Sequence, residues 1–217
     1  GAVSDKRATP LFWKLADIFH SAPVVVKPPV IEPICDTGYD NQCVATIHSP
    51  AFFDGATPDK QQTKIQSDYT ACKSGERVDA YEAWRYDIRD RQRVLLVGAN
   101  DGFLHAFDAG TVISGSTPDP TNCNRAFNSG TGEELWAFVP PDMLPRLKDT
   151  LLSHQYLLDG NTMVRDVWVD VNGDRVKQKT EFRTVAVLSE RAGGTQYTGL
   201  DVTDVQNPVM LWTFPPP

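Results

Sequence analysis

The sequence predicts an all-β fold built from four-stranded antiparallel units. Short β-branched and aromatic runs, separated by turns that contain Gly or Asn, account for most of the patterned chain. Helical periodicity is scarce and is confined to residues 9–19 and 141–153, the second stretch being interrupted by Pro145. The chain also repeats itself, and this repetition is the strongest of the three observations.

The repetition covers turn residues as well as hydrophobic positions. The stretch "RVLLVGANDGFLHAFDA…GTGEELWAF" aligns with "RTVAVLSERAGGTQYTGLDVTDVQNPVMLWTF". In both, an Arg-led strand, a Gly-containing turn and a strand ending in Asp precede a strand with Leu-Trp-x-Phe. Four antiparallel strands repeated in this way are typical of a β-propeller blade. A β-sandwich built from similar hairpins is the alternative.

Five residues make up the blade motif, and each suits its position chemically. Asp108 and Asp201 end the third strands, where a carboxylate can accept N–H groups of the following turn. Gly132 supplies the positive φ that a Thr-Gly turn requires. Trp136 and Trp212 lie on the fourth strands, where an indole offers a broad apolar surface to a neighbouring blade.

The repeat divides the chain into about two blades. Residues 15–139 form the first blade, with insertions at 27–90 and 110–129. Residues 140–154 form a linker with a short helix, and residues 155–214 form the second blade. Because two blades cannot close a ring, we expect the chain to be an excerpt of a longer protein.

The long insertions are the expected contact surfaces, since unpatterned loops on a rigid scaffold often carry function. Aromatic residues are enriched at the centres of interfaces, which makes those of the first insertion candidates for exposed contacts. The alternative is that they pack the insertion against its own blade. These residues are Tyr39, Phe52, Phe53, Tyr69, Tyr81, Trp84 and Tyr86.

A tight hairpin is expected at "VNGD", because Asn172-Gly173 suits the positive φ angles of a type I′ turn. The same stretch imitates a calcium loop. Its residues at loop positions one, three, five and twelve are Asp170, Asn172, Asp174 and Glu181. Position six is Arg175, where an EF-hand loop needs Gly. The hairpin is therefore favoured, and no metal site is predicted.

Four cysteines, Cys35, Cys43, Cys72 and Cys123, lie in loop-like stretches rather than in apolar ones. This placement favours disulfides and an oxidising compartment. Cys35 and Cys43 can close a local loop, leaving Cys72 and Cys123 to join the two insertions, although three connectivities are possible. A metal site is the rival interpretation, but no CxxC pair or suitably spaced His accompanies the cysteines.

Composition argues against several classes of partner. The formal net charge of the 217 residues is −7, and acidic and basic residues are interspersed. No basic run predicts nucleic-acid binding, and no apolar run is long enough to cross a membrane. The first residues lack the pattern of a signal peptide, as a processed or excerpted chain also would.

Catalytic patterns are weak. The four histidines, His20, His48, His105 and His154, are dispersed, and none has a convincing third partner for a triad. Ser21 follows His20 at the start of a strand, where its hydroxyl is expected to bond to the backbone. The chain is therefore predicted not to be an enzyme.

Several quoted stretches together resemble the C-terminal β-propeller of the PilY-type family of type IV pilus biogenesis and tip-adhesin proteins. In chain order they are "LADIFHSAPVVV", "VLLVGANDGFLHAFDAG…TGEELWAFVPPDMLPRL", "YLLDGNTMVRDVWV" and "FRTVAVL…GLDVTDVQNPVMLWTF". The resemblance implies an extracellular protein of the cell surface or pilus tip that passes through the periplasm. It implies roles in pilus assembly, surface adhesion and twitching motility, with minor pilins and a host or abiotic surface as partners.

Two departures from the family are visible. The Gly-rich turn usual after "FRTVAVL" is replaced by "SERAGGTQ". The family's Asp-rich calcium loop generally lies in a later blade, so calcium is expected outside this segment and no cofactor within it. Quinoprotein dehydrogenases, which hold pyrroloquinoline quinone and calcium, share the blade motif, but the adjacent Cys-Cys pair of those enzymes is missing. A propeller scaffold of outer-membrane assembly is a further alternative.

Overall fold

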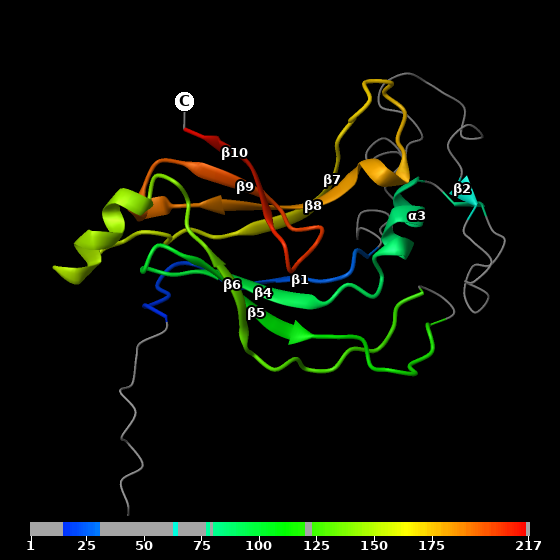
Figure 1. The fold of residues 1–217 in the computed structure, drawn as a ribbon, viewed down its shortest axis with the longest axis horizontal. Coiled ribbons are helices and arrows are strands. Elements are labelled where there is room, and N and C mark those ends of the chain that lie inside the picture. Colours follow the sequence, from blue (N-terminus) through cyan, green and yellow to red (C-terminus); the bar gives the residue numbers. More distant parts are fainter. Residues whose placement is uncertain (1–14, 31–62, 65–76, 79, 120–122, 216–217) are drawn as a thin grey trace, which may run out of the picture.

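The computed structural model describes residues 15–30, 63–64, 77–78, 80–119 and 123–215. Two four-stranded antiparallel sheets dominate this part of the chain, and they lie one against the other in Figure 1. A short ladder also joins β2 (Thr63–Lys64) to β3 (Arg77–Val78). The predicted all-β fold of four-stranded antiparallel units is confirmed.

Each sheet is a simple meander in chain order. The first sheet has the order β1-β4-β5-β6, with β1 (Val24–Val26), β4 (Arg93–Gly98), β5 (Leu104–Gly110) and β6 (Glu134–Phe138). The second has the order β7-β8-β9-β10, with β7 (Met163–Trp168), β8 (Phe182–Ser189), β9 (Tyr197–Asp201) and β10 (Val209–Phe214). This up-and-down order is that of propeller blades.

The turn between β4 and β5 forms where the sequence places Asn-Asp-Gly. Ala99 N donates to the carbonyl of Phe103 at 3.0 Å, and Gly102 N donates to the carbonyl of Ala99 at 3.0 Å. Gly102 has a φ of 93°, a value that residues with a Cβ rarely adopt.

Helical structure is short and lies between strands. The only α-helix among the described residues is α3 (Ala80–Asp87), which the sequence patterns did not predict. The 3-10 helix η2 (Leu144–Leu151) forms where a short helix was expected, and η3 (Lys179–Glu181) and η4 (Arg191–Gly193) are single turns. Of the expected helix at 9–19, residues 15–19 are described and are not helical. No described helix has the length and apolar character needed to cross a bilayer.

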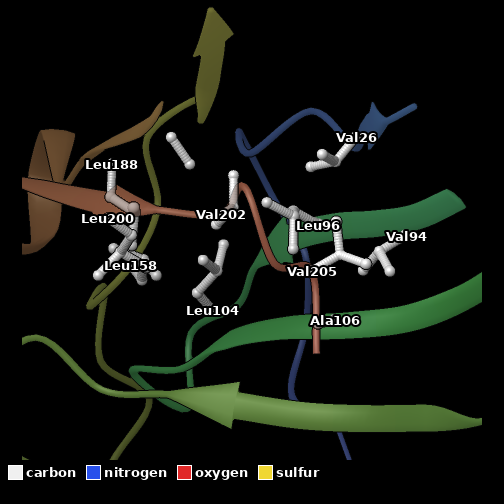
Figure 2. Packing of buried hydrophobic residues seen from close by; sticks show 11 residues of the cluster. Val26, Val94, Leu96, Leu104, Ala106, Leu158, Leu188, Leu200, Val202 and Val205 are labelled. Carbon is white, nitrogen blue, oxygen red and sulfur yellow. The ribbon is translucent and has the colours of Figure 1, made fainter. Parts of the chain in front are cut away.

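The core lies between the two sheets, as the close-up in Figure 2 shows. Side chains from both sheets and from the adjoining turns form one buried cluster. Its members are Val26, Val94, Leu96, Leu104, Ala106, Leu158, Ala186, Leu188, Leu200, Val202 and Val205. Burial of each large aliphatic side chain contributes about 2 kcal/mol, so this interface fixes how the sheets face each other.

The expected tight hairpin at Asn172-Gly173 is wrong. Strand β8 begins at Phe182, and Trp168 pairs with Phe182 at the end of the ladder. Between them, Val169 N donates to the carbonyl of Glu181 at 2.9 Å and closes a longer loop. Asp170 accepts hydrogen bonds from Gly173 N and Arg175 N inside that loop. Short polar side chains that bond nearby backbone compete with a strand ladder, which explains the difference.

Candidate functional site

The register of the two sheets reveals equivalent rows of side chains. In the first sheet, consecutive cross-strand partners give the row Val24, Leu96, Ala106 and Trp136. In the second sheet, the equivalent row is Met163, Val187, Gly199 and Trp212. Each fourth strand carries an irregularity of register immediately before its tryptophan, at Leu135 and at Leu211. The repeat read from the sequence therefore extends to the three-dimensional register.

Trp136 joins the two sheets. Its indole packs against the core cluster, and its Nε1 donates a hydrogen bond to the carbonyl of Val205, 2.7 Å away. Val205 belongs to the turn between β9 and β10 of the second sheet. The row of Trp136 is thus covered by the following sheet, with Leu96 and Ala106 fully buried.

Trp212 occupies the equivalent place on the side of the second sheet that faces away from the first. Leu200, the residue after Gly199, lies in the core cluster, and alternation along β9 therefore places Gly199 and Trp212 on the opposite face. The indole lies directly over Gly199, whose α-carbon leaves room for no side chain there. Trp212 is 40% exposed and Met163 is 59% exposed.

We call this surface the outer face of the second sheet. Its exposed apolar residues are Met163, Tyr197, Val209, Trp212 and Phe214. Contiguous exposed apolar surface on one sheet face is typical of a docking site for another protein element. The outer face is therefore the candidate functional site, and its chemistry is burial of apolar surface with one indole N–H available for positioning.

The Asp of the first blade motif organises the turn that leads to β6. Asp108 Oδ2 accepts hydrogen bonds from Thr131 N at 2.7 Å and Thr131 Oγ1 at 3.0 Å. Its Oδ1 accepts from Gln92 Nε2 at 2.7 Å and Gly110 N at 3.1 Å. These bonds, that from Gln92 foremost, lower the pKa of Asp108 to about 2. Gly132 in the same turn has a φ of 73°.

The Asp of the second motif makes fewer bonds. Asp201 Oδ1 accepts from Thr203 N at 2.9 Å, and its Oδ2 lies 3.4 Å from Arg183 Nε. The structure thus places both motif carboxylates at the same point of the repeat. They differ because the second unit has a short turn in place of the insertion that Asp108 closes.

The loop between β7 and β8 gathers the residues that imitate a calcium loop. Oxygen atoms of Asp170, Asp174 and Glu181 lie within 4.8 Å of one another. Asn172 is beside them and donates from Nδ2 to Asp174 Oδ2 at 3.0 Å. Glu181 is buried and accepts from Trp168 Nε1 at 3.0 Å and from Gln178 N at 3.1 Å. The hydrogen bonds described for this loop account for its shape. The expectation that no metal binds here stays a prediction.

Two of the aromatic residues expected to be exposed are buried, which corrects that expectation. Tyr81 and Trp84 on α3 pack against Phe182 of β8, with ring centroids 5.4 Å and 5.8 Å from it. Helix α3, the described helix of the first insertion, therefore packs on the second sheet. Tyr86 is partly buried, under the guanidinium of Arg89.

The remaining aromatic candidates, Tyr39, Phe52, Phe53 and Tyr69, lie outside the described residues, as do Cys35, Cys43 and Cys72. Cys123 is described, is 4% exposed and has a φ of 63°. Its segment is held at the base by a bridge between Val112 and Phe127. The disulfide pairing stays a prediction.

The histidines that the structure describes pair with separate carboxylates. His20 Nδ1 lies 2.6 Å from Asp159 Oδ2, and His105 Nδ1 lies 2.6 Å from Glu134 Oε1. Ser21 Oγ accepts from Gly98 N at 3.1 Å, so its hydroxyl bonds to the backbone as expected.

Sequence reasoning missed the acidic partners of His105, which are Glu134 on β6 and Asp101 in the β4–β5 turn. The signal available in the sequence was that His105 alternates with apolar residues in a predicted strand. Pairing of β5 with β6 then brings Glu134 close. Burial disfavours the charged form of the His105 imidazole and so lowers its pKa. The two carboxylates outweigh this effect, and the pKa of His105 is raised above its ordinary value.

Comparison with known proteins supports the family suggested by the motifs. The chain is 35% identical over 138 residues to a "Type IV pilus biogenesis factor PilY1 homolog" of Xylella fastidiosa, covering 62% of this chain and 9% of that protein. It is 30% identical over 138 residues to PilY1 of Pseudomonas aeruginosa strain PAO1, covering 61% of this chain and 9% of that protein. These relatives confirm the predicted resemblance to the PilY-type family. No family model matches the chain.

Among solved structures, the crystal structure of the Pseudomonas aeruginosa PilY1 C-terminal domain is similar at 28% sequence identity. The match covers 62% of this chain and 21% of that chain, with a TM-score of 0.38. For the two curated relatives named above, the matched part of this chain spans about a tenth of the length of each relative, 9% in both cases.

Proposed function

We propose that this chain is part of a type IV pilus biogenesis protein of the PilY type that does not catalyse a reaction. The observation that carries the proposal is the 35% identity to the Xylella pilus biogenesis factor. In this role the protein is extracellular, at the cell surface or pilus tip, after transit through the periplasm. It supports pilus assembly, adhesion to a host or abiotic surface and twitching motility, with minor pilins as its partners.

The architecture suits a scaffold that displays contact surfaces. Residues 15–139 and 155–214 act as two successive blades, and the insertions at 27–90 and 110–129 provide variable surface. Disulfides among Cys35, Cys43, Cys72 and Cys123 hold these insertions in the oxidising compartment. The outer face of the second sheet, being equivalent to the covered face of the first, receives a further blade of the same protein.

Deletion of the gene tests the proposal, and surface pili and twitching zones are the readouts. We expect both to be abolished or reduced, and to be restored by the wild-type gene. A complementing gene with Trp212→Ala is expected to restore less, since it weakens the outer face. Leu151→Ala is the matched control because Leu151 is 87% exposed and lies on η2, which is not part of the second sheet.

Normal piliation in the deletion strain contradicts the proposal. So does calcium-dependent dye reduction with alcohols by the full-length protein reconstituted with pyrroloquinoline quinone, because that activity identifies a dehydrogenase. Depleted outer-membrane proteins with normal pili identify an assembly scaffold instead.

A further inference from the structure

A pocket of about 320 Å³ lies between edge strands of the two sheets. Strand β1 is at one edge of the first sheet, β7 is at one edge of the second, and the two strands are neighbours (Figure 1). The volume is in the range of small-molecule sites. None of the residues that define the outer face of the second sheet lines this pocket, so it is a separate feature of the molecule.

The wall of the pocket combines apolar surface with an excess of positive charge. Four valines and two prolines supply the apolar part. Three basic residues, Lys27, Arg91 and Arg165, line the pocket together with one acidic residue, Asp166. The whole chain carries a formal net charge of −7, so this local excess runs against its composition. Such a wall is suited to a ligand that is anionic at one end and apolar at the other.

Arg91 is held in the pocket wall by bonds to both sheets. Its Nη1 donates to Thr184 Oγ1 on β8 at 2.8 Å and to the carbonyl of Thr203 at 3.4 Å. Its Nη2 donates to the carbonyl of Lys27, which follows β1. The Nε–H is buried and has no acceptor among the described residues. The guanidinium is therefore fixed in place without a full set of acceptors.

Asp166 does not neutralise the basic residues by direct contact. Its Oδ1 accepts from Thr184 Oγ1 at 2.8 Å, and its Oδ2 accepts from the hydroxyl of Tyr81 at 2.8 Å. Burial lowers the pKa of Arg91 to about 10, so the guanidinium is still charged at neutral pH. A charge held away from water is stabilised by a counter-charge, and an anion in the pocket would provide one.

Lys27 and Arg165 supply the exposed basic groups of the pocket. In the part of the chain that the structure describes, no carboxylate pairs with either side chain. Arg165 Nη1 donates to the carbonyl of Val164 at 2.8 Å, which leaves its other N–H groups for a ligand. Guanidinium and ammonium groups form their strongest hydrogen bonds with anionic oxygens such as those of a carboxylate.

We propose that the pocket between β1 and β7 binds an aliphatic carboxylate. Lys27 and Arg165 hold the carboxylate group, Arg91 adds its positive charge from the wall, and the valines and prolines contact the aliphatic part. A free short-chain acid and the C-terminal residue of a peptide both present this chemistry. The site does not depend on the function proposed above.

The direct test is a titration of the ¹⁵N-labelled wild-type chain with isovalerate, followed by NMR. We expect saturable shifts of the backbone amides of Val25 and Arg165, with weak affinity because the ligand is small. Isovaleramide has the same shape without the charge and is expected to bind about tenfold more weakly. Inorganic phosphate, an anion without an apolar part, is also expected to bind more weakly than isovalerate.

Variants at the exposed basic groups test the assignment without disturbing Arg91, which bridges the sheets. Lys27→Gln and Arg165→Gln are each expected to weaken isovalerate binding by about two- to fivefold, as loss of one exposed ion pair dictates. Lys148→Gln is the matched control, because Lys148 is exposed on η2 and does not line the pocket. It is expected to leave the affinity unchanged.

A dipeptide, acetyl-Ala-Val with a free carboxylate, distinguishes the two sources of the ligand. Tighter binding than isovalerate supports a peptide C-terminus, and weaker binding supports a free acid. The proposal is overturned if isovalerate gives no saturable shifts at the pocket, if isovaleramide or phosphate binds equally well, or if both pocket variants bind isovalerate as the wild type does. The comparison of isovalerate with isovaleramide in the wild type decides the outcome even if a variant fails to fold.

Discussion

The indole of Trp136 and the backbone carbonyl of Val205 are joined by a 2.7 Å hydrogen bond that crosses from one sheet to the other. The bond is surrounded by the buried side chains of both sheets, so it forms in a largely dry environment. It ties the last strand of one repeat to the last turn of the next.

Replacing Trp136 is therefore expected to loosen the two sheets from each other. Trp136→Ala should lower the free energy of unfolding by about 3 kcal/mol, because it leaves a cavity and an unpaired carbonyl. Trp136→Phe should cost about 1 kcal/mol, mainly from the lost hydrogen bond. Urea denaturation measures both. Trp212→Ala is the matched comparison and should cost less, because Trp212 is 40% exposed; equal losses contradict the interpretation.

Gly199 is expected to be essential for the position of Trp212. A Cβ at Gly199 would lie 2.4 Å from Cε2 of Trp212, so Gly199→Ala must displace the indole. The measurement is ¹⁹F NMR of fluorotryptophan, with the Trp212 signal assigned by Trp212→Phe. Gly132→Ala is the control: its Cβ would meet nothing within 4 Å, and only the left-handed backbone costs about 1 kcal/mol. An unmoved Trp212 signal in Gly199→Ala contradicts the prediction.

Asp108 makes the stability of the chain depend on acid pH. Because the folded-state pKa is about 2, below the ordinary 3.8, Asp108 contributes stability that is fully present above the ordinary value. This contribution is lost as pH falls from about 4 through 2. Asp108→Asn should lower stability at neutral pH by about 1 kcal/mol and weaken the acid dependence. Thermal unfolding from pH 2 to 6 tests this, and unchanged acid sensitivity counts against it.

His105 makes the stability of the chain depend on pH in a higher range than Asp108 does. Burial lowers its pKa, but hydrogen bonds to Asp101 and Glu134 outweigh burial, so the pKa lies above the ordinary 6.5. A raised pKa means that stability is fully present below 6.5 and is lost as pH rises through the folded-state value. NMR titration of the imidazole C–H signals should show this, and His105→Gln should remove its share of the dependence.

Burial raises the pKa of Glu190 to about 7, so Glu190, like His105, contributes stability that is lost as pH rises, and the two contributions must be separated. Glu134→Gln is expected to lower the pKa of His105, because it removes one charged acceptor, and to leave the titration of the Glu190 carboxyl group, followed by NMR, unchanged. An imidazole that titrates at or below 6.5 in the wild type contradicts the assignment of His105 as charged in its buried place.

The strands and their repetition could be predicted because turn chemistry and alternation are local properties. Asn100-Asp101-Gly102 gave the β4–β5 turn, and the two Leu-Trp-x-Phe runs gave the final strands of both sheets. The face that each tryptophan occupies needed the structure, because an irregularity of one residue at Leu135 or Leu211 reverses the side of the sheet.

Other features depend on partners that no local pattern specifies. The loop after β7 was mistaken for a tight hairpin because Asp170 and its neighbours bond to their own backbone. Helix α3 was missed because its two buried rings find their partner, Phe182, about a hundred residues later. Likewise, the acceptor for Trp136 is a main-chain carbonyl, which any residue could provide.

The equivalent bulges at Leu135 and Leu211 give the stack of sheets a direction. Trp136 points toward the sheet that follows it in the chain and is received by a turn of that sheet, whereas Trp212 lies on the side of the second sheet that faces away from the first. The donor surface of the first sheet and the acceptor surface of the second are thus different, so a further sheet that met the outer face in the same way would be added head to tail. Such heterologous contacts propagate until a rotation closes them into a ring. If two copies of the chain paired symmetrically through their outer faces, each Trp212 indole N–H would lack a carbonyl acceptor like the one that Val205 provides to Trp136.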